Sequence, residues 1–218
     1  MHTLRAQAVN GDLVELHHPT VELDGPFTSD VEVAFDGLHH QVLSTANRSL
    51  FNFAEVSGEF TIGDMAGHLI ESIDTVATQA VHTYLAVLST DGGVLSTRSY
   101  VSAESVVDLM AALRPTPSRR GAFADPDDTV QFVGPARVSI TTDFGVLALS
   151  PLTTQVVRLL PDWSGSAVAH GELFSGRHSD NAAYLTLVTP TARCVLMVNG
   201  DPDDAVGFMA DLRVDWHT

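Results

Sequence analysis

The chain has 218 residues, of which 44% are hydrophobic and 17% charged, so it holds enough apolar material for a folded core. Its 27 acidic and 11 basic residues give a net charge of −16, and every basic residue is an arginine. A chain without lysine cannot build the usual Walker phosphate loop, protein-kinase nucleotide site or pyridoxal-phosphate Schiff base. Codon bias in a GC-rich genome and selection against lysine-directed tagging both explain this absence, and one sequence does not separate them.

The same composition limits the partners and the compartment. Binding to nucleic-acid phosphates needs clustered basic residues, and the one basic pair is Arg119-Arg120. Cys194 is the only cysteine, so no multi-cysteine metal site exists, and its apolar strand-like surroundings predict a buried thiol. The N-terminus lacks an apolar signal segment, and no apolar run approaches the roughly 20 residues of a membrane span. We therefore expect a cytoplasmic protein without nucleic-acid or membrane partners.

Two hairpins are predicted near the N-terminus. Asn10-Gly11 supplies a turn within residues 3–18, and Asp36-Gly37 supplies a type I′ turn within residues 31–44. In the second hairpin, Val31, Val33 and Phe35 fall on one face of a strand, as expected for a half-buried sheet.

A long helix is predicted over residues 62–82. Apolar residues recur there with helical spacing over about five turns. Thr61 followed by Asp64 resembles a capping box with Asp in place of Glu. The apolar positions are Ile62, Met65, Ala66, Leu69, Ile70, Ile73, Val76, Ala77 and Ala80.

The next elements lead to a predicted domain boundary. Strands at 84–88 and 94–100 flank an Asp-Gly-Gly turn, and Ser102 is a natural N-cap for a helix through Arg114. Two prolines and a glycine in residues 115–121 predict a linker.

Further strands and two helices are predicted in the second half. Asp143-Phe144-Gly145 and the segment after residue 188 supply hairpin turns, and Ser-Pro and Asp-Pro pairs start the helices. The strands are 130–133, 136–142, 146–150, 166–174, 183–188 and 193–198, and the helices are 151–160 and 201–213.

The two halves resemble each other. Tyr84-Leu85 matches Tyr184-Leu185, and after one residue is dropped Met110 matches Met209 and Leu113 matches Leu212. The sequence thus predicts an α+β fold of two similar halves, each roughly ββαββα with mostly antiparallel strands, plus an N-terminal hairpin. The predicted first half covers 1–115, including the hairpin 3–18, a linker covers 116–129, and the pseudo-repeat covers 130–218.

Two families resemble this pattern. The strand, Asp-Gly-Gly turn, strand and helix from Tyr84 to Arg114 are similar to roadblock-type α/β modules. The two-half plan resembles the actinobacterial EspG chaperones of type VII secretion, which are longer than this chain. Both resemblances rest on the order of elements and on no diagnostic motif, so they transfer no functional residue.

Two histidine pairs are the strongest candidates for chemistry. Neighbours on a strand face opposite ways, so one histidine of His17-His18 and one of His39-His40 share a face if their hairpins adjoin. Glu15, on the same face as His17, would be a third ligand for zinc. Exposed or edge-strand histidines, and a pH-dependent interface, are the alternatives.

Other polar clusters have simpler structural interpretations. The acidic turns 125–128 and 201–204 lack the alternating pattern of a calcium loop and suit helix capping. His68 and Glu71 lie on one face of the predicted helix, where a solvated surface is expected. No nucleophile elbow or dinucleotide-binding glycine motif occurs. The sequence therefore assigns no catalytic, cofactor-binding or metal-ligating residue and no cofactor.

The leading hypothesis is a non-catalytic protein-binding protein: an adaptor, assembly factor or secretion-type chaperone that uses a surface or groove of a pseudo-twofold body. Its partner would be another protein or a second copy in a homodimer. One alternative is a metal-dependent or small-molecule enzyme or binder that uses His17, His18, His39 and His40. A third hypothesis is an acidic mimic of nucleic acid.

Overall fold

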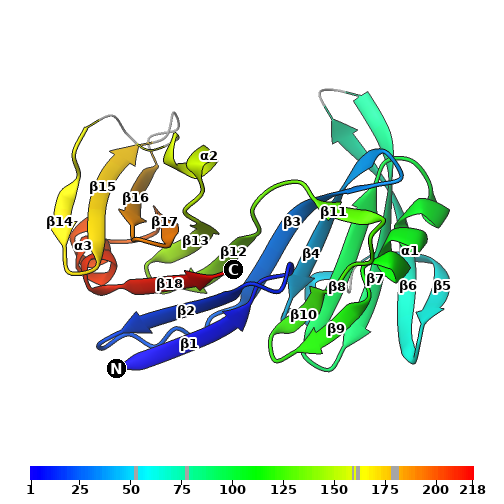
Figure 1. Cartoon of the computed structure of the whole chain (residues 1–218), viewed down its shortest axis with the longest axis horizontal. Coiled ribbons are helices and arrows are strands. Elements are labelled where there is room, and N and C mark those ends of the chain that lie inside the picture. Colours follow the sequence, from blue (N-terminus) through cyan, green and yellow to red (C-terminus); the bar gives the residue numbers. More distant parts are fainter. Residues whose placement is uncertain (52–53, 77–78, 159, 161–162, 178–181) are drawn as a thin grey trace. The chain divides into compact units, whose positions relative to one another are not determined.

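The computed structural model describes residues 1–51, 54–76, 79–158, 160, 163–177 and 182–218 (Figure 1). These residues form mostly antiparallel strands, and the longest of their α-helices have ten residues. Contacts divide the chain into two compact units. Unit 1 comprises Met1–Ala6, Asp12–Phe27 and Arg137–Thr218, and unit 2 comprises Gln7–Gly11 and Thr28–Ala136.

Six antiparallel strands form the main sheet of unit 2, and β11 (Val130–Phe132) pairs with its strand β3. A separate two-stranded sheet is the hairpin of β9 (Pro115–Ser118) and β10 (Gly121–Ala124). The 3-10 turn η1 (Arg48–Phe51) follows β4, and α1 (Ala103–Ala112) follows β8. The sheet order is β3 (Phe27–Phe35), β4 (Leu38–Thr45), β8 (Gly93–Ser99), β7 (Gln79–Thr90), β6 (Met65–Val76) and β5 (Val56–Ile62).

Unit 1 also contains a sheet of six antiparallel strands, followed along the chain by α3 (Pro202–Asp211). A smaller sheet has the order β1 (His2–Gln7), β2 (Leu13–His18) and β18 (Arg213–His217), and α2 (Thr154–Val157) is a single turn. The six-strand order is β14 (Ser166–Val168), β15 (Gly171–Arg177), β16 (Ala183–Val188), β17 (Ala192–Val198), β13 (Gly145–Pro151) and β12 (Arg137–Thr142).

The two six-stranded arrangements have the same connectivity. Numbered along the chain within each unit, the strands lie side by side in the order 1-2-6-5-4-3 in both units. A ten-residue helix follows the sixth strand in each unit. Each unit is therefore a run of six strands closed by one helix, and the same plan occurs twice in the chain.

The two helices bury matching stripes of apolar residues. Ser102 caps α1 by accepting a hydrogen bond from the Ser105 amide, and Asp201 caps α3 through the Asp203 amide. The buried residues recur at helical spacing and at one constant offset of 99 residues. They are Val106, Leu109, Met110 and Leu113 in unit 2, and Ala205, Phe208, Met209 and Leu212 in unit 1.

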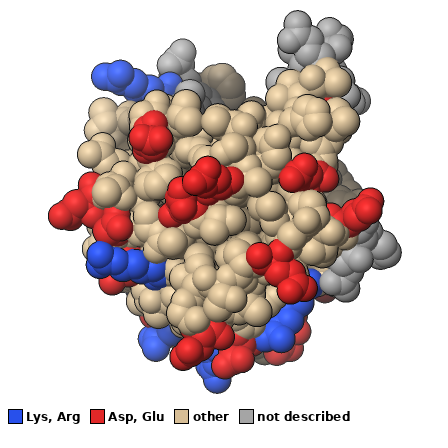
Figure 2. All heavy atoms as spheres, turned by 90° about the vertical axis from the view of Figure 1, so that its right-hand side faces the viewer, with Lys and Arg blue, Asp and Glu red and all other residues tan. Residues whose placement is uncertain are grey.

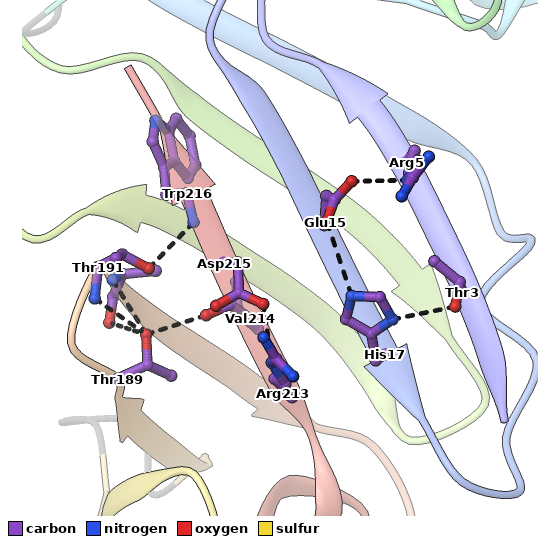
Figure 3. Close-up of polar contacts among 11 residues, drawn as sticks. Thr3, Arg5, Glu15, His17, Thr189, Thr191, Arg213, Val214, Asp215 and Trp216 are labelled. Atoms are coloured by element: carbon purple, nitrogen blue, oxygen red, sulfur yellow. Dashed lines mark hydrogen bonds and ion pairs between the residues drawn. The ribbon is translucent and has the colours of Figure 1, made fainter.

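A buried threonine fixes the tip of the hairpin that precedes the ten-residue helix in each unit. The Thr90 hydroxyl lies 3.2 Å from the Gly93 carbonyl and 3.1 Å from the carbonyl of Gly121, in a strand after the helix. The Thr189 hydroxyl lies 3.3 Å from the carbonyl three residues later, at Ala192, and 3.1 Å from the carbonyl of Val214 in β18 (Figure 3). In each unit this hydroxyl therefore ties the hairpin tip to a strand that comes after the helix, β10 in unit 2 and β18 in unit 1.

The predicted helix over residues 62–82 is wrong, because this segment contributes to the hairpin of β6 and β7; Ala77 and residue 78 lie outside the described residues. Directly opposite Gly67, Phe60 of β5 covers the glycine so closely that a Cβ there would lie 2.3 Å from the ring. A mid-helix glycine and the β-branched residues of this segment favour a strand. The apolar residues of this segment recur with helical spacing because both faces of the long strands are partly exposed, so apolar and polar residues do not alternate strictly.

This finding overturns the predicted α+β fold of ββαββα halves, because antiparallel strands replace the first helix of the first half, and the single turn α2 is all that stands for the first helix of the second half. Residues 151–160 contain only α2, with residue 159 outside the described residues. The predicted linker segment 115–121 belongs to the β9–β10 hairpin, and 166–174 is broken by a turn between β14 and β15. The strand β18 was not predicted.

Most of the short-range turn and cap signals are confirmed. The Ser150-Pro151 pair, expected to start a helix, instead ends β13, and Thr153 caps α2. The hairpins within 3–18, 31–44, 84–100, 136–150 and 183–198 are present, as are the helices within 102–114 and 201–213. Asp36 and Gly37 have φ values of 49° and 72°, as a type I′ turn requires. No described helix has the length and apolar character needed to cross a membrane.

We predict equivalent losses of stability from Leu113→Ala and Leu212→Ala. Both side chains are fully buried, so each truncation should lower the free energy of unfolding by about 2–5 kcal/mol. Urea denaturation measures this, with Val206→Ala, at an exposed position of α3, as a control that should change stability by less than about 0.5 kcal/mol. Losses as small as the control at both leucines would contradict the matched cores.

Thr90→Val and Thr189→Val should each destabilise the protein by about 1–3 kcal/mol, because each leaves buried carbonyls without their donor. Thermal and urea unfolding measure the effect. Thr61→Val, an exposed change in β5, is the matched control. If either buried variant behaves like the control, the hydroxyl does not hold the hairpin tip.

Candidate functional site

A pocket of about 410 Å³ lies beside the N-terminal end of α1, entirely within unit 2. One wall comes from the turn between β3 and β4, and the other from the start of α1. We call it the α1 groove and define it by its lining residues: Phe35, Asp36, Leu38, Val101, Ser102, Glu104, Ser105, Asp108 and Thr129.

Local structure holds both walls of the α1 groove in place. The tight turn at Asp36-Gly37 fixes the hairpin, and the Ser102 cap fixes the start of α1. Thr129 is held by the carboxylate of Asp127, which accepts hydrogen bonds from the Thr129 hydroxyl and amide. These hydrogen bonds lower the pKa of Asp127. The Asp127 amide in turn donates to the Ala112 carbonyl at the end of α1.

The groove combines exposed apolar residues with acidic ones. Leu38 is 39% exposed and Val101 is 56% exposed, which leaves apolar surface in water. Glu104 and Asp108 lie four residues apart on α1, and Asp36 faces them from the turn. The described lining contains no arginine or histidine, and no ion pair in the described part of the chain involves these three acids.

Acidic side chains are spread over a largely uncharged surface on the face of unit 2 drawn in Figure 2. They stand in separate groups, with few arginines between them. On this face the negative charge does not form the continuous strip that a mimic of the nucleic-acid backbone needs.

His40 belongs to the core behind the groove. It is 2% exposed, its ring packs edge-on against Phe35 with centroids 6.2 Å apart, and neither ring nitrogen has a well-formed hydrogen bond. Burial lowers the pKa of His40, and the nearby carbonyls of Phe35 and Arg98 oppose this only in part. Its neighbour His39 is exposed and lies 2.6 Å from Glu32.

His17 and Glu15 share a face of β2, as predicted, but they bind protein groups (Figure 3). His17 Nδ1 lies 3.0 Å from the Thr3 hydroxyl, and its Nε2 lies 3.8 Å from Glu15. Glu15 also pairs with Arg5 at 2.6 Å. This chain of contacts joins β1 and β2 within the small sheet of unit 1.

His18, on the opposite face of β2, is 3% exposed and stacks on Phe208 with ring centroids 5.1 Å apart. Its Nδ1 accepts hydrogen bonds from the amides of Thr20 and Val21, which places the proton of the neutral ring on Nε2. Burial lowers the pKa of His18, while the Phe208 carbonyl and Asp211 act in the opposite direction.

The hairpins of the two histidine pairs are not neighbours in one sheet, because His17 and His18 lie in β2 of the small sheet and His39 and His40 lie in β4 of the main sheet of unit 2. In the described part of the chain, no group of three histidine, cysteine or acidic side chains is placed to hold a metal ion. His68 and Glu71 lie three positions apart on β6, so they face opposite sides of the sheet. Cys194 is fully buried, and burial raises the pKa of its thiol.

Of the two acidic turns, 201–204 starts a helix as expected, whereas 125–128 leads into β11. Asp127 binds Thr129, and Asp201 caps α3.

A second pocket, of about 360 Å³, lies within unit 1 at the C-terminal end of α3. Its polar lining combines His17, His18 and His170 with Asp211 and Arg213, and Arg213 is paired with Asp215 at 2.8 Å.

No family model, curated protein sequence or solved structure matches this chain.

The sequence did not predict the α1 groove, because its two walls lie more than 60 residues apart in the chain. The available signals were local: Glu104 and Asp108 at helical spacing, and apolar Val101 directly before a helix cap.

We predict that unit 2 loses stability as the pH falls below about 6.5, because His40 binds a proton more readily in the unfolded chain than in the core. The loss should continue until the pH reaches the lowered pKa of the folded state. His40→Phe should flatten the dependence of the unfolding free energy on pH between about 7.5 and 5.5.

The control for this experiment is Val42→Ala, a buried neighbour on the same face of β4 that carries no titrating group. It should lower stability equally at every pH. An unchanged slope in His40→Phe would show that His40 does not couple protonation to folding.

Proposed function

We propose that this protein is a non-catalytic protein-binding protein, of adaptor, assembly-factor or chaperone type, and that the α1 groove receives a basic segment of another protein. The observation that carries the proposal is the combination of exposed apolar residues with three unpaired acids and no basic residue in the described lining. A groove of about 410 Å³ has room for a few side chains of such a segment.

Electrostatics favour a cationic partner. Like charges four residues apart on a helix destabilise it by about 0.2–0.5 kcal/mol, so Glu104 and Asp108 repel each other in the free protein. An arginine or lysine between them would relieve this repulsion and gain charge-assisted hydrogen bonds. Binding of this kind weakens as salt rises, because the acids are near the surface.

A second copy of the chain is a poorer occupant of the groove. The chain has a net charge of −16, so two copies repel each other. A symmetric interface would also place the acids of one groove near those of the other. We therefore favour a partner of a different sequence, with positive charge on its binding segment.

The first test uses a random peptide library displayed on phage and selected against the full-length protein. Enriched peptides should contain arginine or lysine beside apolar residues. In fluorescence anisotropy, their binding should weaken as salt is raised and fall at least about tenfold in the double variant Glu104→Arg, Asp108→Arg.

The matched control carries the same charge change away from the groove: Glu59→Arg with Asp64→Arg, on the exposed β5–β6 hairpin. Circular dichroism and thermal unfolding establish that both variants fold. Peptides that bind the two double variants equally well, or a selection that enriches no peptide, would contradict the proposed function.

A further inference from the structure

Three rings stack in a row inside unit 1, and one of them is a histidine. The ring of His18, at the end of β2, lies against Phe208 of α3 with centroids 5.1 Å apart and planes inclined by 23°. Phe208 stacks in turn on Phe144, in the β12–β13 turn, with centroids 4.7 Å apart. The stack therefore joins β2 to α3 through a side chain that can change its charge near neutral pH.

The backbone that follows β2 is hydrogen-bonded to the same ring. His18 Nδ1 accepts hydrogen bonds from the Thr20 amide at 3.2 Å and from the Val21 amide at 2.9 Å. Both bonds need the free lone pair of Nδ1, so they require a neutral ring with its proton on Nε2. One side chain thus fixes the turn after β2 as well as the contact with α3.

A charged ring does not fit this arrangement. An imidazolium carries a hydrogen on both nitrogens, so a protonated His18 would point its Nδ1–H at the two amide hydrogens and lose both bonds. Its charge would also lie in the core, because Nε2 is buried and has no well-formed hydrogen bond with any described residue. The ring must therefore stay neutral in place or move into water to bind a proton.

The groups around His18 do not remove this conflict. Burial and His2 of β1 disfavour the charged ring, whereas the Phe208 carbonyl and Asp211 of α3 favour it; burial has the largest effect, so the pKa of His18 is lowered. The other charged or titratable residues that line the adjoining pocket are His17, His170 and Arg213. Each of these is positive when charged, so none of them stabilises a charged His18.

We propose that His18 is an acid-released latch in unit 1: at neutral pH it holds the turn after β2 and the end of β2 against α3, and its protonation releases both. Release exposes the ring of Phe208, which is only 3% exposed in the closed state, and widens the pocket of about 360 Å³ that His18 lines. The latch lies outside the α1 groove, so this inference goes beyond the proposed function and does not depend on it.

The release should be local. The ladder between β2 and β18 ends at His17, so His18 can leave its place without breaking that ladder. Pro19 and Thr20, which follow it, are exposed. In the six-stranded sheet, β17 pairs with β13 and β16 through backbone bonds that do not involve the ring. We therefore expect the turn after β2 to open while β17 stays paired.

Hydrogen exchange of the full-length protein, followed by NMR between pH 7.5 and 4.5, tests the latch. The opened fraction that exposes the Thr20 and Val21 amides should rise about tenfold for each pH unit below about 6.5, because one proton is bound on release. The rise should stop at the lowered pKa of the folded state. The amide of Leu196, a fully buried residue of β17, should keep its protection throughout.

His18→Asn is the variant that isolates the titrating group. The asparagine side-chain oxygen accepts a hydrogen bond from the amide two residues ahead, as in an Asx turn, and does not titrate in this range. It should abolish the pH dependence of the Thr20 and Val21 protection. His17→Asn, on the opposite face of β2, is the matched control and should leave that dependence unchanged within about twofold.

A second measurement needs no variant. The ¹⁵N shifts of the His18 ring distinguish the neutral form with its proton on Nε2 from the charged form. The ring should remain neutral for as long as the Thr20 and Val21 amides are protected. A charged ring beside protected amides, an unchanged pH dependence in His18→Asn, or a parallel loss of protection at Leu196 would each overturn the latch.

Discussion

Both six-stranded arrangements depend on the return of the sixth strand between the second and the fifth. β8 pairs with β4 and β7, and β17 pairs with β13 and β16, so each last strand is hydrogen-bonded on both edges. This insertion joins the first hairpin to the other strands. It also starts the following helix beside the sheet, where the Thr97 hydroxyl of β8 donates to the Val106 carbonyl of α1.

The position of the α1 groove follows from this connectivity. Because the sixth strand lies next to the second, the helix that follows it begins close to the turn of the first hairpin. Residues 35–38 and 101–108 therefore meet although they are far apart in sequence. In unit 2 the meeting place is lined by Leu38, Val101 and acidic residues, a combination that suits a basic, partly apolar segment better than a small neutral ligand.

Sequence patterns identified the elements that short-range chemistry specifies. Asn-Gly and Asp-Gly turns located hairpins, and the Ser102 and Asp201 caps located α1 and α3. The strands β6 and β7 were mistaken for a helix because their identity depends on partners on both sides, β5 and β8, which spacing within one segment does not reveal. The groove could not be predicted for the same reason, whereas the adjacent His17-His18 and His39-His40 pairs are conspicuous in the sequence but lie in different sheets.

The repeated plan makes the difference between the two units informative. In unit 1 the first turn, α3 and the small sheet are joined by a continuous stack of rings, His18 on Phe208 and Phe208 on Phe144. That stack removes apolar surface from water and stabilises the end of the helix. In unit 2 the residue that matches Phe208, Leu109, is fully buried without such a stack, while Val101 and Leu38 beside the groove are exposed. The two units therefore bury the same helix positions through different contacts, so the shared connectivity fixes the frame but not the side chains that surround the helix.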